Sequence, residues 1–282
     1  MDRGGPGRPI MMAPEFSSGH LGEMPLLWAR PGGDGPWPLA LWLHAFSWSK
    51  EDVEPQLAEL AVRGFIALSW DLPQHGARST ETRDELKLRV RTDLRRHFWP
   101  ILAQGADEAS RIIDWALAHL DIRPRIAIGG ISMGGDIAVA AAGADRRIDR
   151  VAATLATPDW LRPGSHEPQG MAGEAEWNLY HRLNPLTNID HYAHRPAMLF
   201  ACGADDRQVP PEGAEAFVAA SRELYADCPD RLRIACEPGT AHRFTPWMWG
   251  KALQWFEGGD AVPLGKTESP ASSAITASDS NR

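Results

Sequence analysis

The chain has 282 residues, of which 43% are hydrophobic, and a formal net charge of −8 at pH 7. Its basic residues are scattered, which argues against nucleic acid or an anionic membrane surface as the main partner. The sequence contains neither the roughly twenty consecutive apolar residues of a membrane span nor the apolar core of a signal peptide. Three cysteines without C-x-x-C spacing do not predict a disulfide framework. We therefore expect a protein of the reducing cytoplasm.

Composition divides the chain into three parts. Residues 1–22 predict a flexible N-terminal arm, and residues 258–282 are polar and predict a disordered C-terminal tail. Residues 23–257 are long enough to bury one sizeable core, and α/β chains of this length commonly form a single domain.

Short apolar runs predict the strands of this domain: 24–29, 39–44, 65–71, 125–130, 151–156, 197–202 and 232–237. The runs are almost continuously apolar, as in parallel strands that are covered on both faces. Between them, apolar residues at helical spacing predict helices, for example over 107–120, 213–224 and 247–256. This alternation predicts an α/β fold with a doubly wound, mostly parallel sheet and right-handed crossovers.

The connection over residues 157–196 is longer than a crossover requires and predicts a short cap insertion over the strand ends. Two interpretations are open. The insertion is either a surface excursion with a small core of its own, or a lid whose Trp160 and Trp177 bind an apolar substrate.

The strongest motif is the G-x-S-x-G sequence of residues 130–134, with Ser132 at its centre. It directly follows an apolar strand and precedes an Ala-rich helical pattern. So tight a turn forces the central residue into a strained conformation and projects its side chain above the sheet, while the glycines avoid backbone collisions. The helix N-terminus also favours negative charge. The motif therefore predicts Ser132 as a nucleophile; the alternative is a glycine-rich turn with an incidental serine.

Other motifs at or near this turn are incomplete. A dinucleotide-binding G-x-G-x-x-G would need glycines where Ile131 and Ser132 stand, and a P-loop would need a following lysine. The H-x-x-H pair of His191 and His194 has no evident third ligand, so we expect a solvent-exposed segment of the cap there. We expect no cofactor and no metal.

A serine hydroxyl needs a base to take its proton, and in this fold the acid and then the histidine follow the nucleophile along the chain. Asp205 and Asp206 come shortly after the strand 197–202, where ligands bind in parallel sheets. His242 follows the last predicted strand and is the only histidine after both aspartates. The residues alone leave the choice of aspartate open, and either could be a turn residue.

The loop after the strand 39–44 stands where one backbone N–H of an oxyanion hole is expected, and the other would come from Met133. We expect His44, at the end of that strand, to brace the loop by a hydrogen bond. Proton transfer by His44 is the weaker alternative.

Five segments together resemble the α/β-hydrolase superfamily: LALWLHAFSWSKED, SWDLPQHGARS, IGGISMGG, GADDRQVP and PGTAHRFTP. They most resemble small bacterial carboxylesterases near the dienelactone-hydrolase and prolyl-oligopeptidase branches. The resemblance runs from about residue 24 to 257, and the ordered set is much more specific than any one segment.

The resemblance implies a role for each site residue. It assigns the nucleophile to Ser132, the acid to Asp206 rather than its neighbour, the base to His242, and the oxyanion amides to Phe46 and Met133. It implies hydrolysis of a small-molecule ester through an acyl-enzyme, without metal or organic cofactor. His75 and Gly76 in the second segment are read as structural.

The chain departs from the resembled pattern at two positions. Ala45 replaces the usual glycine after the loop histidine, which bears on the geometry of the oxyanion loop. Dienelactone hydrolases proper use a cysteine where this chain has Ser132. Three other functions remain open: acyl transfer to another acceptor, cleavage of an amide or carbon–carbon bond by the same triad, and a non-catalytic binding module. The last would show a broken triad.

Overall fold

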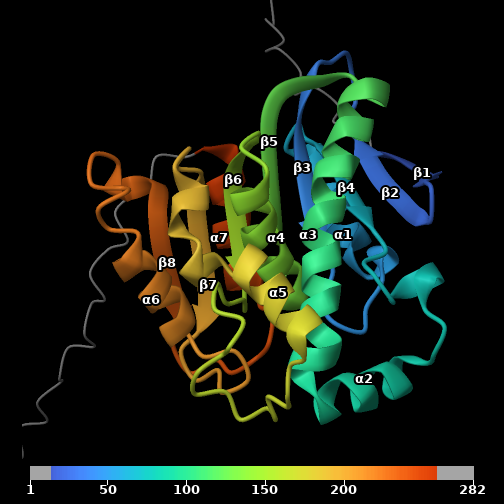
Figure 1. Ribbon diagram of the computed structural model, residues 1–282. Coiled ribbons are helices and arrows are strands. Elements are labelled where there is room, and N and C mark those ends of the chain that lie inside the picture. Colours follow the sequence, from blue (N-terminus) through green and yellow to red (C-terminus); the bar gives the residue numbers. More distant parts are fainter. Residues whose placement is uncertain (1–13, 259–282) are drawn as a thin grey trace, which may run out of the picture.

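Short apolar runs become the strands of one eight-stranded sheet in the computed structural model, which describes residues 14–258 (Figure 1). The strands are β1 (Glu15–Leu21), β2 (Met24–Arg30), β3 (Trp37–Leu43), β4 (Ile66–Trp70), β5 (Ile122–Ile131), β6 (Ile148–Thr154), β7 (Ala197–Gly203) and β8 (Leu232–Glu237). Their order in the sheet is β1-β2-β4-β3-β5-β6-β7-β8. The pairs β1–β2 and β2–β4 are antiparallel and the remaining neighbours are parallel. The predicted strands and the mostly parallel sheet are confirmed.

The first strand corrects the prediction of a flexible arm over residues 1–22. Residues 15–21 pair along their whole length with β2. The turn between the two strands contains Gly22, which adopts φ +60°. β1 lies at the edge of the sheet, and its residues alternate between exposed and half-buried positions. It therefore lacks the continuous apolar run that marks the inner strands. Residues 1–13 of the predicted arm and 259–282 of the predicted tail lie outside the described residues.

Helices cover both faces of the sheet (Figure 1). They are α1 (Glu54–Val62), α2 (Arg83–Thr92), α3 (Leu94–His119), α4 (Met133–Ala144), α5 (Glu174–Leu183), α6 (Glu212–Ala220) and α7 (Pro246–Glu257). Buried side chains of α1 and α7 form one core cluster, and those of α2 to α6 form the other. This two-layer covering is the predicted doubly wound arrangement. Within residues 14–258, none of the helices has the length and apolar character that a bilayer span requires.

The helix that carries the G-x-S-x-G motif is packed unusually closely. In α3, a Cβ added at Gly105 would lie 2.7 Å from Ile137 Cδ1 of α4, so a larger residue there would require the Ile137 side chain to shift. The α4 sequence, MGGDIAVAAAGA, is rich in small residues and buried along most of its length. These small residues let α4 pack closely between the sheet and α3, and this packing fixes the position of the start of the helix.

The cap insertion, residues 157–196, connects β6 to β7 and carries α5. It packs on the main domain. The ring of Tyr180 stacks on Trp99 of α3 at 5.0 Å between centroids, and the Tyr192 hydroxyl donates a 2.9 Å hydrogen bond to the Val139 carbonyl of α4. The interpretation as an excursion with a separate small core is therefore wrong, because these aromatic side chains extend the core of the domain.

Candidate active site

Ser132 sits at the sharp turn between β5 and α4. Its backbone has φ 53° and ψ −113°, a sparsely populated region for a residue with a side chain. The Ser132 N–H donates a 2.7 Å hydrogen bond to the Thr154 carbonyl at the end of β6, which holds the strained turn against the sheet. The predicted strained conformation at Ser132 is confirmed.

The two glycines of the motif allow the loop after β3 to touch this turn. A Cβ at Gly134 would lie 2.5 Å from the Leu43 carbonyl oxygen and 2.7 Å from that of His44. A Cβ at Gly130 would lie 2.6 Å from the Gly134 backbone. Real Cβ atoms do not approach other atoms so closely, so larger residues would push the loop away. The start of the loop after β3, at Leu43 and His44, consequently lies against the turn that holds Ser132.

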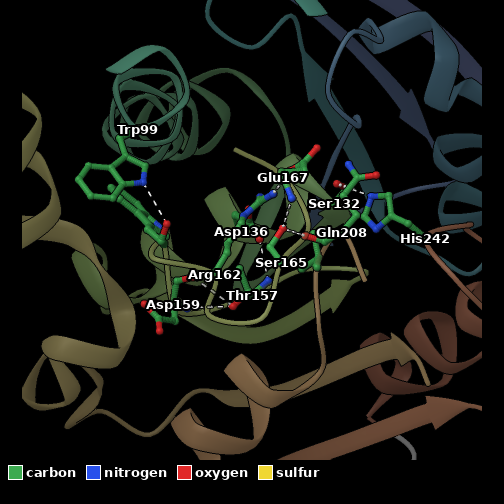
Figure 2. Close-up of polar contacts among 12 residues, drawn as sticks. Trp99, Ser132, Asp136, Thr157, Asp159, Arg162, Ser165, Glu167, Gln208 and His242 are labelled. Carbon is green, nitrogen blue, oxygen red and sulfur yellow. Dashed lines mark hydrogen bonds and ion pairs between the residues drawn. The ribbon is translucent and has the colours of Figure 1, made fainter. Parts of the chain in front are cut away.

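The structure brings Ser132, His242 and Asp206 together in one hydrogen-bonded line. Ser132 Oγ lies 3.0 Å from His242 Nε2, a contact that Figure 2 shows, and His242 Nδ1 lies 2.7 Å from Asp206 Oδ2. If Nδ1–H donates to the carboxylate, Nε2 of the neutral ring carries the lone pair that faces the serine hydroxyl. This arrangement can accept the serine proton.

Asp206, and not Asp205, faces the histidine. The Asp206 side chain is buried, and its Oδ1 accepts 2.9 Å hydrogen bonds from the N–H groups of Gln208 and Val209. Those bonds leave Oδ2 directed at His242. Asp205 is exposed. Adjacent residues in this turn therefore have opposite environments.

The loops that carry Asp206 and His242 are bonded to each other. The Ala204 N–H donates to the Glu237 carbonyl at 3.0 Å, and the Asp205 N–H donates to the Thr240 carbonyl at 2.9 Å. A Cβ at Gly203 would lie only 2.4 Å from the Thr240 carbonyl oxygen. Asp206 and His242 thus lie on two loops that are joined at the ends of β7 and β8.

A buried ion pair that the sequence patterns do not identify lies one helical turn beyond the serine. Asp136 of α4 is fully buried and accepts hydrogen bonds from Arg162 Nη2 at 2.5 Å and from the Thr157 N–H at 2.7 Å (Figure 2). Burial raises the pKa of Asp136, and the Arg162 charge opposes that rise. The available signal was a lone carboxylate in an Ala-rich helix. The pair ties the cap insertion to the helix that Ser132 begins.

The same segment of the cap also bonds the acid loop. Ser165 Oγ donates to the Gln208 carbonyl at 2.8 Å, as drawn in Figure 2, and the His166 N–H donates to the Arg207 carbonyl at 2.9 Å. Residues 162–166 therefore connect α4 to the turn that carries Asp206.

Two other histidines near the site are structural. His44 Nε2 accepts from the Leu72 N–H at 3.1 Å, and its Nδ1 donates to the Ala45 carbonyl at 2.9 Å, which confirms the predicted bracing. Burial lowers the pKa of His44 to about 3. His75 Nδ1 donates to the Pro73 carbonyl at 2.7 Å, and burial lowers the pKa of His75 to about 4. Both rings are therefore neutral near pH 7 and act as hydrogen-bonding braces.

These two rings predict acid-sensitive stability. Between pH 6.5 and their lowered pKa values, the unfolded chain binds a proton at each ring that the folded chain excludes. The free energy of unfolding therefore rises with pH in this window and is lost as pH falls through it. For each ring we expect a loss of about 2 kcal/mol at pH 5 relative to neutral pH. Urea unfolding at both pH values measures the loss.

In the variant His75→Gln, the fall in the free energy of unfolding between neutral pH and pH 5 should be about 2 kcal/mol smaller than in the wild type. His20→Gln, at an exposed position in β1, is the matched control and should behave as the wild type. An unchanged pH dependence in His75→Gln would contradict the assignment of a proton-excluding ring.

The structure separates the two tryptophans predicted to contact substrate. Trp160 is 1% exposed within the core, and its carbonyl accepts a 3.1 Å hydrogen bond from Trp99 Nε1. The prediction for Trp160 is therefore wrong, because its side chain offers no surface to a ligand. Trp177 is half-buried, meets Trp99 edge-on at 5.3 Å and stacks on His181 at 5.8 Å. Contact between Trp177 and substrate stays a prediction.

The H-x-x-H pair lies in the cap after α5, with His191 exposed and His194 half-buried. In the part of the chain that the structure describes, no group of three or more His, Cys, Asp or Glu side chains is arranged to hold a metal ion.

Comparisons with known proteins identify the family of the chain. The family model of the prolyl oligopeptidase family matches residues 105–248. The chain is 27% identical over 265 residues to the esterase YjfP of Escherichia coli (strain K12), covering 86% of this chain and 98% of the relative.

Two solved structures share the fold. TT1662 from Thermus thermophilus superposes with a TM-score of 0.71 at 24% identity, covering 88% of this chain and 98% of that one. A thermophilic esterase from Thermogutta terrifontis superposes with a TM-score of 0.57 at 19% identity, covering 92% and 97%. The family match spans more than half of the chain, and the mostly parallel sheet covered by helices fits the α/β-hydrolase fold. The protein is a hydrolytic enzyme of the prolyl oligopeptidase family, with the α/β-hydrolase fold.

Proposed function

We propose that the protein is a serine esterase that cleaves a carboxylic ester of a small molecule through an acyl-enzyme formed on Ser132. The observation that carries the proposal is the unbroken line from Ser132 Oγ to His242 Nε2, at 3.0 Å, and from His242 Nδ1 to Asp206 Oδ2, at 2.7 Å. The choice of an ester rests on the likeness to the E. coli esterase, which spans 98% of that relative.

In the first half-reaction, Ser132 Oγ attacks the ester carbonyl carbon while His242 Nε2 takes the hydroxyl proton. The carbonyl oxygen gains negative charge and accepts hydrogen bonds from the N–H groups of Phe46 and Met133. Removing one such donor commonly costs about 3–4 kcal/mol of transition-state stabilisation. Support for these donors comes from the contact of the β3 loop with the turn at Gly134.

The tetrahedral intermediate collapses when His242 returns its proton to the departing alkoxide, and the alcohol leaves. A water molecule then gives a proton to His242 as its oxygen attacks the acyl carbon. Collapse releases the carboxylic acid and restores the Ser132 hydroxyl. Throughout, the Asp206 carboxylate holds the His242 ring in place and stabilises the imidazolium, and the N–H groups of Gln208 and Val209 fix its orientation.

A fluorophosphonate probe tests the nucleophile. The wild type should gain one phosphonyl group, located by peptide mass spectrometry on the peptide that contains Ser132, and Ser132→Ala should gain none. Equal labelling of the two proteins, or no labelling of either, would overturn the proposal. An aryl ester and an aryl amide with the same acyl group then test the bond. Faster turnover of the amide would contradict the ester assignment.

A further inference from the structure

Two cysteines lie side by side at the roots of the catalytic loops. Cys202 in β7 and Cys236 in β8 are register partners, and both pack toward the same core cluster. The two strands are parallel neighbours in the sheet (Figure 1). Neighbouring strands are separated by about 4.8 Å, within the Cα separation of about 4.4–6.8 Å that a disulfide spans. Both thiols are free. The register therefore places the two thiols within reach of each other.

The two thiols have different environments. Cys202 is buried at 3% exposure, whereas Cys236 is half-buried on β8, the edge strand. A hydrogen bond from the Cys202 thiol lowers the pKa of Cys236, and that bond together with burial raises the pKa of Cys202. The thiolate is the reactive form of cysteine. Cys236 is thus the more accessible of the two cysteines and the one that more readily forms a thiolate. Cys202 is its register partner and supplies the second thiol.

Each cysteine directly precedes a residue through which the loops of Asp206 and His242 contact each other. Cys202 precedes Gly203, where a Cβ would lie 2.4 Å from the Thr240 carbonyl oxygen, and Cys236 precedes Glu237, whose carbonyl accepts from the Ala204 N–H at 3.0 Å. These contacts join the two catalytic loops. The two free sulfurs must approach each other from non-bonded contact to an S–S bond of about 2.05 Å. A disulfide would therefore draw the strand ends together and shift Asp206 relative to His242.

We propose that Cys202 and Cys236 form a modification site at which a peroxide oxidises the two thiols to a disulfide, and that the disulfide form hydrolyses substrate more slowly. The Cys236 thiolate attacks one oxygen of hydrogen peroxide, the O–O bond breaks, and a sulfenic acid and hydroxide form. Cys202 sulfur then attacks the sulfenic sulfur and loses its proton, and the S–O bond breaks to release water. Overall, the two thiols lose two electrons and the peroxide is reduced to two waters.

Hydrogen peroxide added to the reduced full-length protein tests the modification. We expect the three free cysteines to fall to one, Cys228, by thiol titration. A cross-linked peptide should join positions 202 and 236, with a mass about 2 Da below the sum of its parts. Absence of this peptide, or a cross-linked peptide that contains Cys228 instead, would overturn the proposed disulfide site. These readouts do not depend on catalysis.

The effect on turnover rests on the proposed function. Because small misplacements of catalytic groups are costly, we expect oxidation to lower kcat for an aryl ester about tenfold, with recovery on adding dithiothreitol. Cys228→Ser is the matched control and should respond as the wild type. Cys236→Ser and Cys236→Ala should keep their activity in peroxide.

A disulfide formed without any change in kcat would overturn the inhibitory half of the proposal. If none of the reduced proteins hydrolyses the ester, the esterase assignment fails, while thiol titration and peptide mass still decide the cysteine pair.

Discussion

Replacing Ser132 with alanine is expected to lower kcat for an aryl ester by about 10⁴-fold or more, because the variant lacks the atom that forms the acyl-enzyme. Alanine has the same Cβ as serine, so the strain at φ 53° and the packing of the turn should be retained. Steady-state kinetics measure the loss, and thermal unfolding checks that the fold is intact. Ser18→Ala, at an exposed position in β1, is the control and should keep full activity.

A double variant sharpens this prediction. Ser132 and His242 are joined by the 3.0 Å contact and act as a unit, so His242→Ala should lose activity to a similar extent. The double variant Ser132→Ala/His242→Ala should then lose little more than either single variant. Additive losses would show that the two side chains act independently, and retained activity in Ser132→Ala would point to a different nucleophile.

The second large effect is expected for Asp206→Asn, which should lower kcat by about 10³–10⁴-fold. Asp206 Oδ1 is held by the N–H groups of Gln208 and Val209, so the amide oxygen of asparagine should keep that position. The amide NH₂ then faces His242 Nδ1 and forces it to become an acceptor. The ring proton moves to Nε2, and the base toward Ser132 is lost.

Asp205→Asn is the matched control for this prediction. Asp205 is exposed, and its N–H, which the substitution retains, donates to the Thr240 carbonyl at 2.9 Å. Its kcat should stay within about threefold of the wild type, because surface substitutions away from buried or hydrogen-bonded side chains usually have small effects. A large loss in Asp205→Asn with a normal Asp206→Asn would reverse the choice of acid.

Local patterns in the sequence were sufficient for the framework. Inner strands such as β5 and β7 are covered on both faces, so their continuous apolar runs predict them directly. The G-x-S-x-G motif between a strand and an Ala-rich helix predicts the strained serine, since its geometry depends on a few consecutive residues. The edge strand β1 and the charged helix α2 were missed, because β1 has no fully buried residue and α2 buries only Leu86 and Val90.

What only the tertiary structure decided concerns partners far apart in the chain. The sequence by itself determined the fold class, the serine turn and the order of nucleophile, acid and histidine. The residues alone left Asp205 and Asp206 open, and the family resemblance implied Asp206. The hydrogen bond between Asp206 and His242, the Asp136–Arg162 ion pair and the pairing of Cys202 with Cys236 required the folded chain. The physical reason is that these contacts depend on strand order, register and the path of the cap insertion. Those properties follow from packing of the whole core, which no short window of sequence contains.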